Sequence, residues 1–127
     1  MPGTLVVKPA AGRLTRDTEA VGTMDPYVKV TVGTRQERSK VHADGGKFPQ
    51  WSDSFTFSIV NEDLVKIECW NRNHVASDDC IGEGAVPIAT IAAAGKWNDW
   101  VELTYRGRSC GHIQCDITYT GTGEESK

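Results

Sequence analysis

Residues 71–82, with the sequence NRNHVASDDCIG, gather oxygen-bearing side chains at a spacing typical of a metal-binding loop. Asn71 and Asn73 lie one residue apart, and Asp78 and Asp79 close the segment before an Ile-Gly pair. Hard cations such as calcium prefer oxygen ligands, and carboxylates supply both lone pairs and countercharge. An asparagine carbonyl supplies an oxygen but no charge. The segment therefore indicates a metal-binding loop that lacks part of its charge.

Length and composition predict one globular domain that positions this loop. The chain has 127 residues, of which 39% are hydrophobic and 24% charged, with a net charge of −3. We expect a single domain over residues 3–120 and a flexible polar tail at 121–127. The N-terminus shows no secretory leader, which favours a cytoplasmic protein. The small net charge means that any attraction to an anionic partner must come from a local patch.

Alternation of apolar and polar residues predicts an all-β fold. Strand-like segments separated by Gly, Pro, Asn and Asp lie at 5–7, 28–32, 37–41, 55–59, 65–69, 80–88, 97–105 and 113–119. That number and spacing indicate an eight-stranded antiparallel β-sandwich in which one face of each strand is buried. Residues 87–95, PIATIAAAG, are too rich in alanine for a strand and end in glycine. They predict one short helix near 88–94.

The four cysteines carry no metal-binding or redox motif. They lie at positions 69, 80, 110 and 115, without CxxC spacing. Because no export signal is visible, we interpret them as reduced thiols, two of them facing the core, with disulfide pairing as the alternative.

The distribution of catalytic residue types argues against an enzyme. The three histidines are scattered and form no constellation with Ser, Cys or Asp, and no glycine-rich loop is placed to hold phosphates. We therefore predict a non-catalytic protein. A dense basic stripe with interleaved aromatic residues is also absent, so we expect no nucleic-acid partner.

Four segments together resemble the C2 domain, a calcium- and lipid-binding β-sandwich. They are GTLVVKPAAGRL, VGTMDPYVKV, GKFPQWSDSFTF and VKIECWN followed by DDCIGEG, and the resemblance covers residues 3–119. The patterns GxxDPYVKV and PxWxxxFxF at this separation are specific, and DGGKFPQW is similar to small stand-alone C2 proteins of plants. One strand precedes DPYV and an extra strand, GHIQCDITY, follows WVEL. This order resembles the C2 connectivity whose permuted strand lies at the C-terminus.

The resemblance implies a calcium site at one end of the sandwich, where family members place five carboxylates. Carried over position by position, the ligand set is Glu19, Asp25, Asn71, Asn73 and Asp79. Asp17 and Asp78 are candidates for the surrounding shell. The family set would carry −5, whereas this one carries −3, so we expect calcium binding to be weak or lost. Each residue also has a plainer interpretation, since Asp and Asn commonly hydrogen-bond locally in turns.

Two further features of the resemblance concern membranes. The loop tips carry Val21 and Val75, which are small and permit only shallow insertion. A basic face used by some C2 domains for anionic lipid falls on four residues: Lys29, Arg38, Lys40 and Lys66. Glu37 and Glu68 lie close by in sequence, so an ordinary solvated face of mixed charge is the alternative.

These observations predict a non-enzymatic, peripheral membrane-targeting module that binds anionic phospholipid with weakened or absent calcium dependence. The alternative is a calcium-independent protein–protein interaction module, anchored by Trp70 with the exposed parts of Trp97 and Trp100, because aromatic residues dominate binding hot spots.

Overall fold

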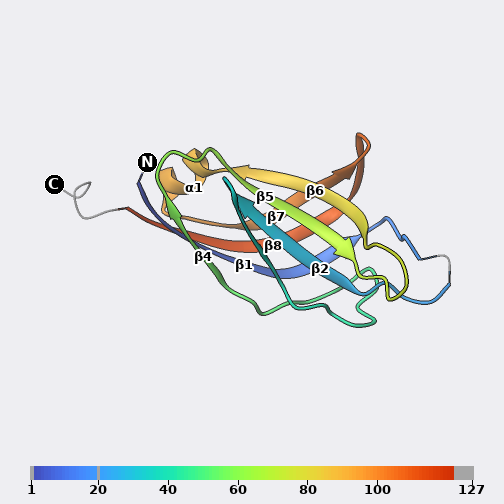
Figure 1. Ribbon diagram of the computed structural model, residues 1–127. Helices are drawn as coiled ribbons and strands as arrows, with labels where there is room; N and C mark the ends of the chain where they lie inside the picture. Colours follow the sequence, from blue (N-terminus) through green and yellow to red (C-terminus); the bar gives the residue numbers. More distant parts are fainter. Residues whose placement is uncertain (1, 20, 122–127) are drawn as a thin grey trace.

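The computed structural model of the chain describes residues 2–19 and 21–121, and these form an all-β sandwich with one helix (Figure 1). The elements are β1 Gly3–Leu14, β2 Pro26–Val32, β3 Arg35–Arg38, β4 Phe55–Ile59, β5 Leu64–Asn71, β6 Asp79–Pro87, α1 Ile88–Ala94, β7 Lys96–Tyr105 and β8 Arg108–Gly121. The predicted eight antiparallel strands are confirmed. The expected tail at 121–127 begins inside β8, and its residues 122–127 lie outside the described ranges.

Two groups of four strands make up the sandwich. The strand order is β3-β2-β5-β6-β7-β8-β1-β4, and every pairing is antiparallel. In the described part of the chain β6 and β7 are joined by a single pair, Glu83 with Thr104, where one layer passes into the other. The C-terminal β8 lies between β1 and β7. One strand thus precedes the DPYV segment and the extra C-terminal strand lies beside it, which is the C2 connectivity predicted from the sequence.

The core follows from the alternation seen in the sequence. Val28, Val30 and Val32 of β2 are fully buried, as are Ile113 and Ile117 of β8 in the other layer. Burying a side chain of this size contributes about 1.5–3 kcal/mol. A shift of register by one residue would turn each set outward, so the apolar pattern fixes the pairing of the strands and hence the positions of the loops between them.

The cysteines are all free thiols. Cys69, Cys110 and Cys115 are buried and Cys80 is partly exposed, so three thiols rather than the expected two face the core. Burial raises the pKa of the Cys115 thiol to about 12, and the pKa of Cys69 is also raised, chiefly by burial.

The helix α1 spans Ile88–Ala94, as predicted. It buries Ile88 and Ile91, one turn apart, against the end of the sandwich. Gly95 ends it in the left-handed conformation, with φ of 80°, and its N–H donates to the Ile91 carbonyl at 2.8 Å. Within the described residues no helix has the length and apolar character needed to cross a membrane.

The close approach of β6 to β7 depends on Gly84. A Cβ atom at this position would lie 2.2 Å from the carbonyl oxygen of Glu102 on β7. We expect Gly84→Ala to lower the free energy of unfolding by about 1–3 kcal/mol, because the backbone must move apart to admit the methyl group. Urea denaturation measures this loss, with Ala85→Ser at the neighbouring exposed position as the control. Equal stability of the two variants would contradict the close packing of these strands.

Candidate functional site

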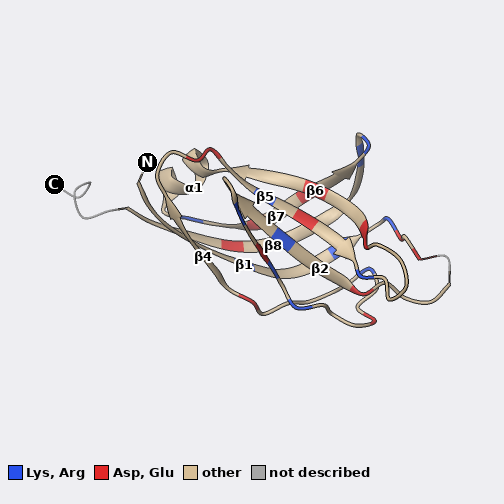
Figure 2. Ribbon diagram, viewed as in Figure 1, with Lys and Arg blue, Asp and Glu red and all other residues tan. Residues whose placement is uncertain are grey.

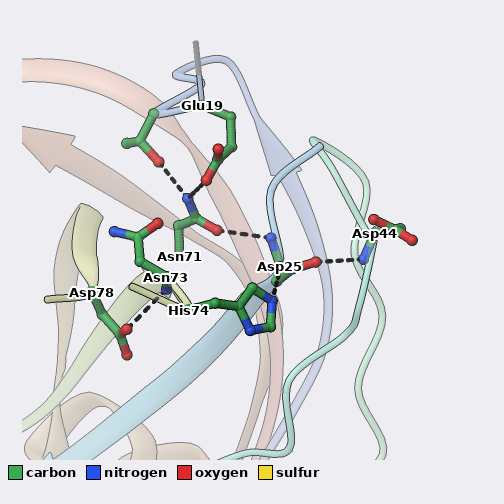
Figure 3. Close-up of polar contacts among 8 residues, drawn as sticks. Glu19, Asp25, Asp44, Asn71, Asn73, His74 and Asp78 are labelled. Carbon is green, nitrogen blue, oxygen red and sulfur yellow. Dashed lines mark hydrogen bonds and ion pairs between the residues drawn. The ribbon is translucent and has the colours of Figure 1, made fainter. Parts of the chain in front are cut away.

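The predicted ligand residues converge at the end of the sandwich where β1, β2, β5 and β6 are connected. Loop 1 comprises residues 15–25, of which residue 20 is not described, and loop 3 comprises residues 72–78. Asn71, the last residue of β5, is completely buried between them. Its Oδ1 accepts a hydrogen bond from the backbone N–H of Asp25 at 2.8 Å. Its Nδ2 donates to Glu19 Oε2 at 2.6 Å and to Thr18 Oγ1 at 3.0 Å (Figure 3).

The carboxylate of Asp25 is also engaged by the protein itself. Its Oδ1 accepts from the backbone N–H of Asp44 at 2.8 Å. Its Oδ2 lies 3.7 Å from Nε2 of His74, which projects from loop 3 and is mostly exposed (Figure 3). The main chain adds a link, since the N–H of Arg72 donates to the Asp25 carbonyl at 3.1 Å. Asp25 therefore joins loop 1 to loop 3 and to the segment that contains Asp44.

Loop 3 is closed by a second asparagine. Asn73 Nδ2 donates to the Ser77 carbonyl at 2.7 Å and to Asp79 Oδ2 at 3.1 Å. The Asn73 backbone N–H donates to Asp78 Oδ1 at 3.0 Å. The other oxygen of Asp78 accepts from the Tyr27 hydroxyl at 2.5 Å. The bonds of Asn73 thus close loop 3, and the bond between Tyr27 and Asp78 links the loop to β2.

The arrangement does not fit a calcium ion. In the described ranges no three His, Cys, Asp or Glu side chains are grouped so that they could hold a metal. Calcium needs about six to eight oxygens that converge on one point. Here Asn71 presents its amide nitrogen to Glu19, and Asn73 presents its amide nitrogen to Asp79. Each asparagine thus turns an amide nitrogen, which is not a ligand for a hard cation, toward a carboxylate.

A pocket of about 520 Å³ opens between the loops. Its lining includes Glu19, Asp25 and Arg72, so both signs of charge face it. The tips beside it carry Val21 and Val75, whose side chains are 87% and 101% exposed. Both tip residues therefore lie at one end of the molecule, beside the loop pocket.

The structure adds a third apolar tip that sequence reasoning missed. Phe48, in the segment between β3 and β4, is 72% exposed. The backbone around it is fixed to the same end of the sandwich, because Leu14 N–H donates to the Lys47 carbonyl at 2.8 Å and Gly46 N–H donates to the Met24 carbonyl at 3.1 Å. An aromatic residue before a proline was visible in the sequence, but no local pattern indicates that its ring faces solvent.

The predicted basic face lies on the outer side of β2 and β3. Lys29 and Arg38 are cross-strand partners. The Lys29 ammonium lies 4.0 Å from the centre of the Trp70 ring, and the Arg38 guanidinium lies 4.2 Å from the centre of the Tyr27 ring. Neither forms an ion pair with a described carboxylate. Such cation–π contacts hold the charged groups in place above the sheet.

The remaining two members of the predicted face differ in their surroundings. Lys66 lies 3.2 Å from Glu83 and 3.7 Å from Glu68, and these carboxylates raise its pKa. Its charge is therefore largely neutralised. Lys40 is exposed just beyond the end of β3. Figure 2 shows the resulting mixture of basic and acidic positions over β2, β5 and β6.

Comparison with known proteins identifies the class that this fold and loop end define. A family profile for the C2 domain matches residues 3–103. The chain belongs to the C2 domain family, and C2 domains are generally non-catalytic modules.

Individual relatives agree with the resemblance to small plant C2 proteins. Elicitor-responsive protein 3 of Oryza sativa subsp. japonica is 27% identical over 124 residues, which cover 93% of this chain and 83% of the relative. The 16 kDa phloem protein 2 of Arabidopsis thaliana is 28% identical over 94 residues, covering 73% of this chain and 64% of that protein.

Solved structures share the fold. A C2 domain-containing protein superposes with a TM-score of 0.84 at 23% identity, covering 99% of this chain and 94% of its own. A calcium-bound pair of C2 domains from Extended-Synaptotagmin 2 gives a TM-score of 0.81 at 16% identity, covering 94% of this chain and 46% of that one.

A double substitution tests the hydrogen bonds that Asn71 and Asn73 donate to carboxylates. In Asn71→Asp/Asn73→Asp, carboxylates replace the amide donors that face Glu19 and Asp79. Without calcium we expect the free energy of unfolding of this variant to be about 2–4 kcal/mol lower than that of the wild type, because a buried hydrogen bond becomes a contact between like charges. Millimolar calcium should raise the melting temperature of this variant and leave the wild type unchanged.

The exposed double substitution Asn61→Asp/Asn98→Asp adds the same two negative charges and provides the matched control. A melting temperature of the wild-type protein that rises with calcium would contradict the interpretation of Asn71 and Asn73.

The bond between Tyr27 and Asp78 makes stability depend on pH. Burial, followed by the hydrogen bond to Asp78, raises the pKa of Tyr27 from 10.0 to about 12. The bond from Tyr27, followed by that from the Asn73 N–H, lowers the pKa of Asp78 below its ordinary value of 3.8. A lowered carboxyl pKa means that the stabilisation is present above the ordinary pKa and is lost as pH falls through the lowered value.

We therefore expect Tyr27→Phe to cost on the order of 1 kcal/mol at neutral pH and less in acid, where Asp78 becomes protonated. Urea denaturation across the acidic range measures the difference. Tyr119→Phe is the control, since its hydroxyl donates at 2.7 Å to a neutral acceptor, the Pro2 carbonyl. If the loss in free energy of unfolding caused by Tyr27→Phe stays constant down to the lowest pH, the Asp78 carboxylate is not the acceptor of the Tyr27 hydroxyl.

Proposed function

We propose that this C2 domain is a non-enzymatic module that attaches peripherally to anionic phospholipid membranes, at the cytoplasmic side, without requiring calcium. The observation that carries the proposal is the pair formed by Lys29 and Arg38 on the outer face of β2 and β3. Both cations are held in place over aromatic rings; neither forms an ion pair with a described carboxylate, although their charges act on the nearby Asp78. Lys40 extends the same edge toward the loops.

The energetics favour a local contact. Each cation near an anionic membrane surface contributes about 1 kcal/mol, and the effect decays within a Debye length. The protein as a whole carries −3, so attraction depends on how the basic face is oriented toward the membrane. The fixed positions of Lys29 and Arg38 reduce the conformational entropy that would be lost on binding.

The loop end supports the same orientation. Val21, Phe48 and Val75 are exposed around the pocket end of the sandwich. Burial of small apolar tips among lipid headgroups adds to electrostatic attraction, in proportion to the apolar area removed from water. Asn71 joins loop 1 to the end of β5 and Asn73 closes loop 3, so hydrogen bonds of the protein itself hold this surface together.

The alternative function, a protein-interaction surface built on tryptophans, receives less support from the geometry. The Lys29 ammonium covers the Trp70 ring, and the Arg13 guanidinium lies 4.4 Å from the centre of the Trp100 ring. Trp97 is partly buried against the core. These rings offer little free aromatic surface to a partner.

Sedimentation with vesicles of phosphatidylcholine mixed with phosphatidylserine or a phosphatidylinositol monophosphate tests the proposal. We expect the wild type to bind equally with calcium and with chelator, and Lys29→Gln/Arg38→Gln to bind roughly tenfold or more weakly. Lys8→Gln/Lys96→Gln, exposed on the other layer, removes the same charge and should bind like the wild type. Absence of wild-type sedimentation, or equal weakening by both pairs, would sink the proposal.

A further inference from the structure

A second pocket, separate from the loop pocket and from the basic face, lies beside the turn that connects β7 to β8. Its volume is about 350 Å³, which is the lower end of the range for small-molecule sites. Three arginines line it, with two hydroxyl-bearing residues and one aromatic ring: Arg16, Arg106, Arg108, Thr15, Ser109 and Tyr105. No aspartate or glutamate contributes to this lining. The chemistry of the pocket is therefore that of an anion site.

Arg16 forms the fixed wall of this pocket. Its Nη1 donates to the carbonyl oxygen of Cys80 at 2.9 Å, with a longer contact of 3.5 Å to that of Ile81. Its guanidinium carbon lies 3.8 Å from the centre of the Tyr105 ring. A guanidinium carries five N–H donors, and these contacts use only those of Nη1. The donors on its other nitrogens have no acceptor in the part of the chain that the structure describes.

Arg106 and Arg108 approach from the turn between the strands. Tyr105 and Arg108 are paired, so Arg106 and Gly107 form a two-residue turn. Both have positive φ, 53° and 81°. Such turns favour Asn or Gly at the first position, and another residue held there is strained. The strained conformation places the Arg106 guanidinium carbon 5.2 Å from the centre of the same Tyr105 ring. Two guanidinium groups thus share one aromatic ring.

In the part of the chain that the structure describes, no ion pair neutralises the positive charge of the pocket, since none of these three arginines pairs with an aspartate or glutamate. Like charges held this close repel one another, and a bound anion would remove that repulsion. Arginine is the side chain best suited to a phosphate group, because its planar fork donates two parallel hydrogen bonds to two oxygens.

We propose that this pocket binds a phosphate monoester, with Arg16, Arg106 and Arg108 donating to the phosphate oxygens and the hydroxyls of Thr15 and Ser109 completing the contact. The Tyr105 ring serves as the platform on which two of the guanidinium groups are held. The site goes beyond the proposed membrane function, since it shares no residue with the face of Lys29 and Arg38. The pocket would bind phosphate even if that face did not bind a membrane.

Two sources could supply this chemistry, a soluble phosphate ester or a phosphorylated lipid headgroup. Inositol trisphosphate in solution represents the first source, and vesicles of phosphatidylcholine with a phosphatidylinositol monophosphate represent the second. Amide chemical shifts recorded during titration with inositol trisphosphate locate the site. Saturable changes in chemical shift are expected at Thr15, Arg16 and 105–109. No saturable change is expected at the strand residues around Lys29 and Arg38.

The test variant is Arg106→Asn/Arg108→Gln, which keeps a residue suited to positive φ at the turn and leaves the structural contacts of Arg16 intact. We expect its dissociation constant for inositol trisphosphate to rise roughly tenfold for each arginine removed, since each loses hydrogen bonds to a charged group. Arg106→Lys/Arg108→Lys keeps the charge and should show a smaller loss. Lys8→Gln/Lys96→Gln should bind like the wild type.

The outcomes are separable from those of the membrane proposal. If Lys29→Gln/Arg38→Gln loses vesicle binding but keeps the shifts at 105–109, both sites exist and are independent. If inositol trisphosphate binds, and the wild type and Arg106→Asn/Arg108→Gln bind vesicles equally, the ligand of this pocket is a soluble phosphate ester. Absence of saturable shifts at the turn, or equal affinity of wild type and Arg106→Asn/Arg108→Gln for inositol trisphosphate, would overturn the assignment of this pocket.

Discussion

The side-chain amide of Asn71 connects segments that are far apart along the chain. Its oxygen receives the N–H of Asp25 and its nitrogen donates to Thr18 and Glu19, all at a position with no solvent exposure. Every hydrogen bond of this group is made inside the protein, where an unmade bond costs about 1–3 kcal/mol. The loop end of the sandwich therefore has one favoured arrangement, and the pocket and the apolar tips depend on it.

An amide in this place gives the loops a different electrostatic character from a metal-bridged site. A divalent ion draws carboxylates together by cancelling their charge, whereas Asn71 and Asn73 each donate a hydrogen bond to one carboxylate. Arg72 in the loop pocket supplies a positive group from the protein itself. The mixed charge of the pocket arises because Arg72 lines it together with Glu19 and Asp25. In the proposed function, recognition of a membrane surface depends on these permanent groups and not on the concentration of an ion.

The fold could be predicted from the sequence almost completely, because strand alternation and the limits of α1 are local signals. Val28, Val30 and Val32 had to face inward, and Gly95 had to end the helix. The side chains of the loops were less predictable. The sequence placed Asn71 near Asp25. It could not show whether the Asn71 side chain presents its oxygen or its nitrogen to Glu19, because these two residues are 52 positions apart in the sequence. The exposure of Phe48 and of the arginines in the β7–β8 turn could not be predicted, because it is set by tertiary packing.

The buried thiols described with the core have a consequence for the chemical behaviour of the whole protein. Nucleophilic attack on a disulfide or an alkylating reagent requires the thiolate. A pKa of about 12 leaves Cys115 protonated at any physiological pH, and Cys69 is held protonated in the same way by its burial. These sulfurs act as small apolar groups, so the folded domain can pass between reducing and mildly oxidising surroundings without covalent change at its centre. Rapid modification of Cys69 or Cys115 would thus report that the sandwich has opened.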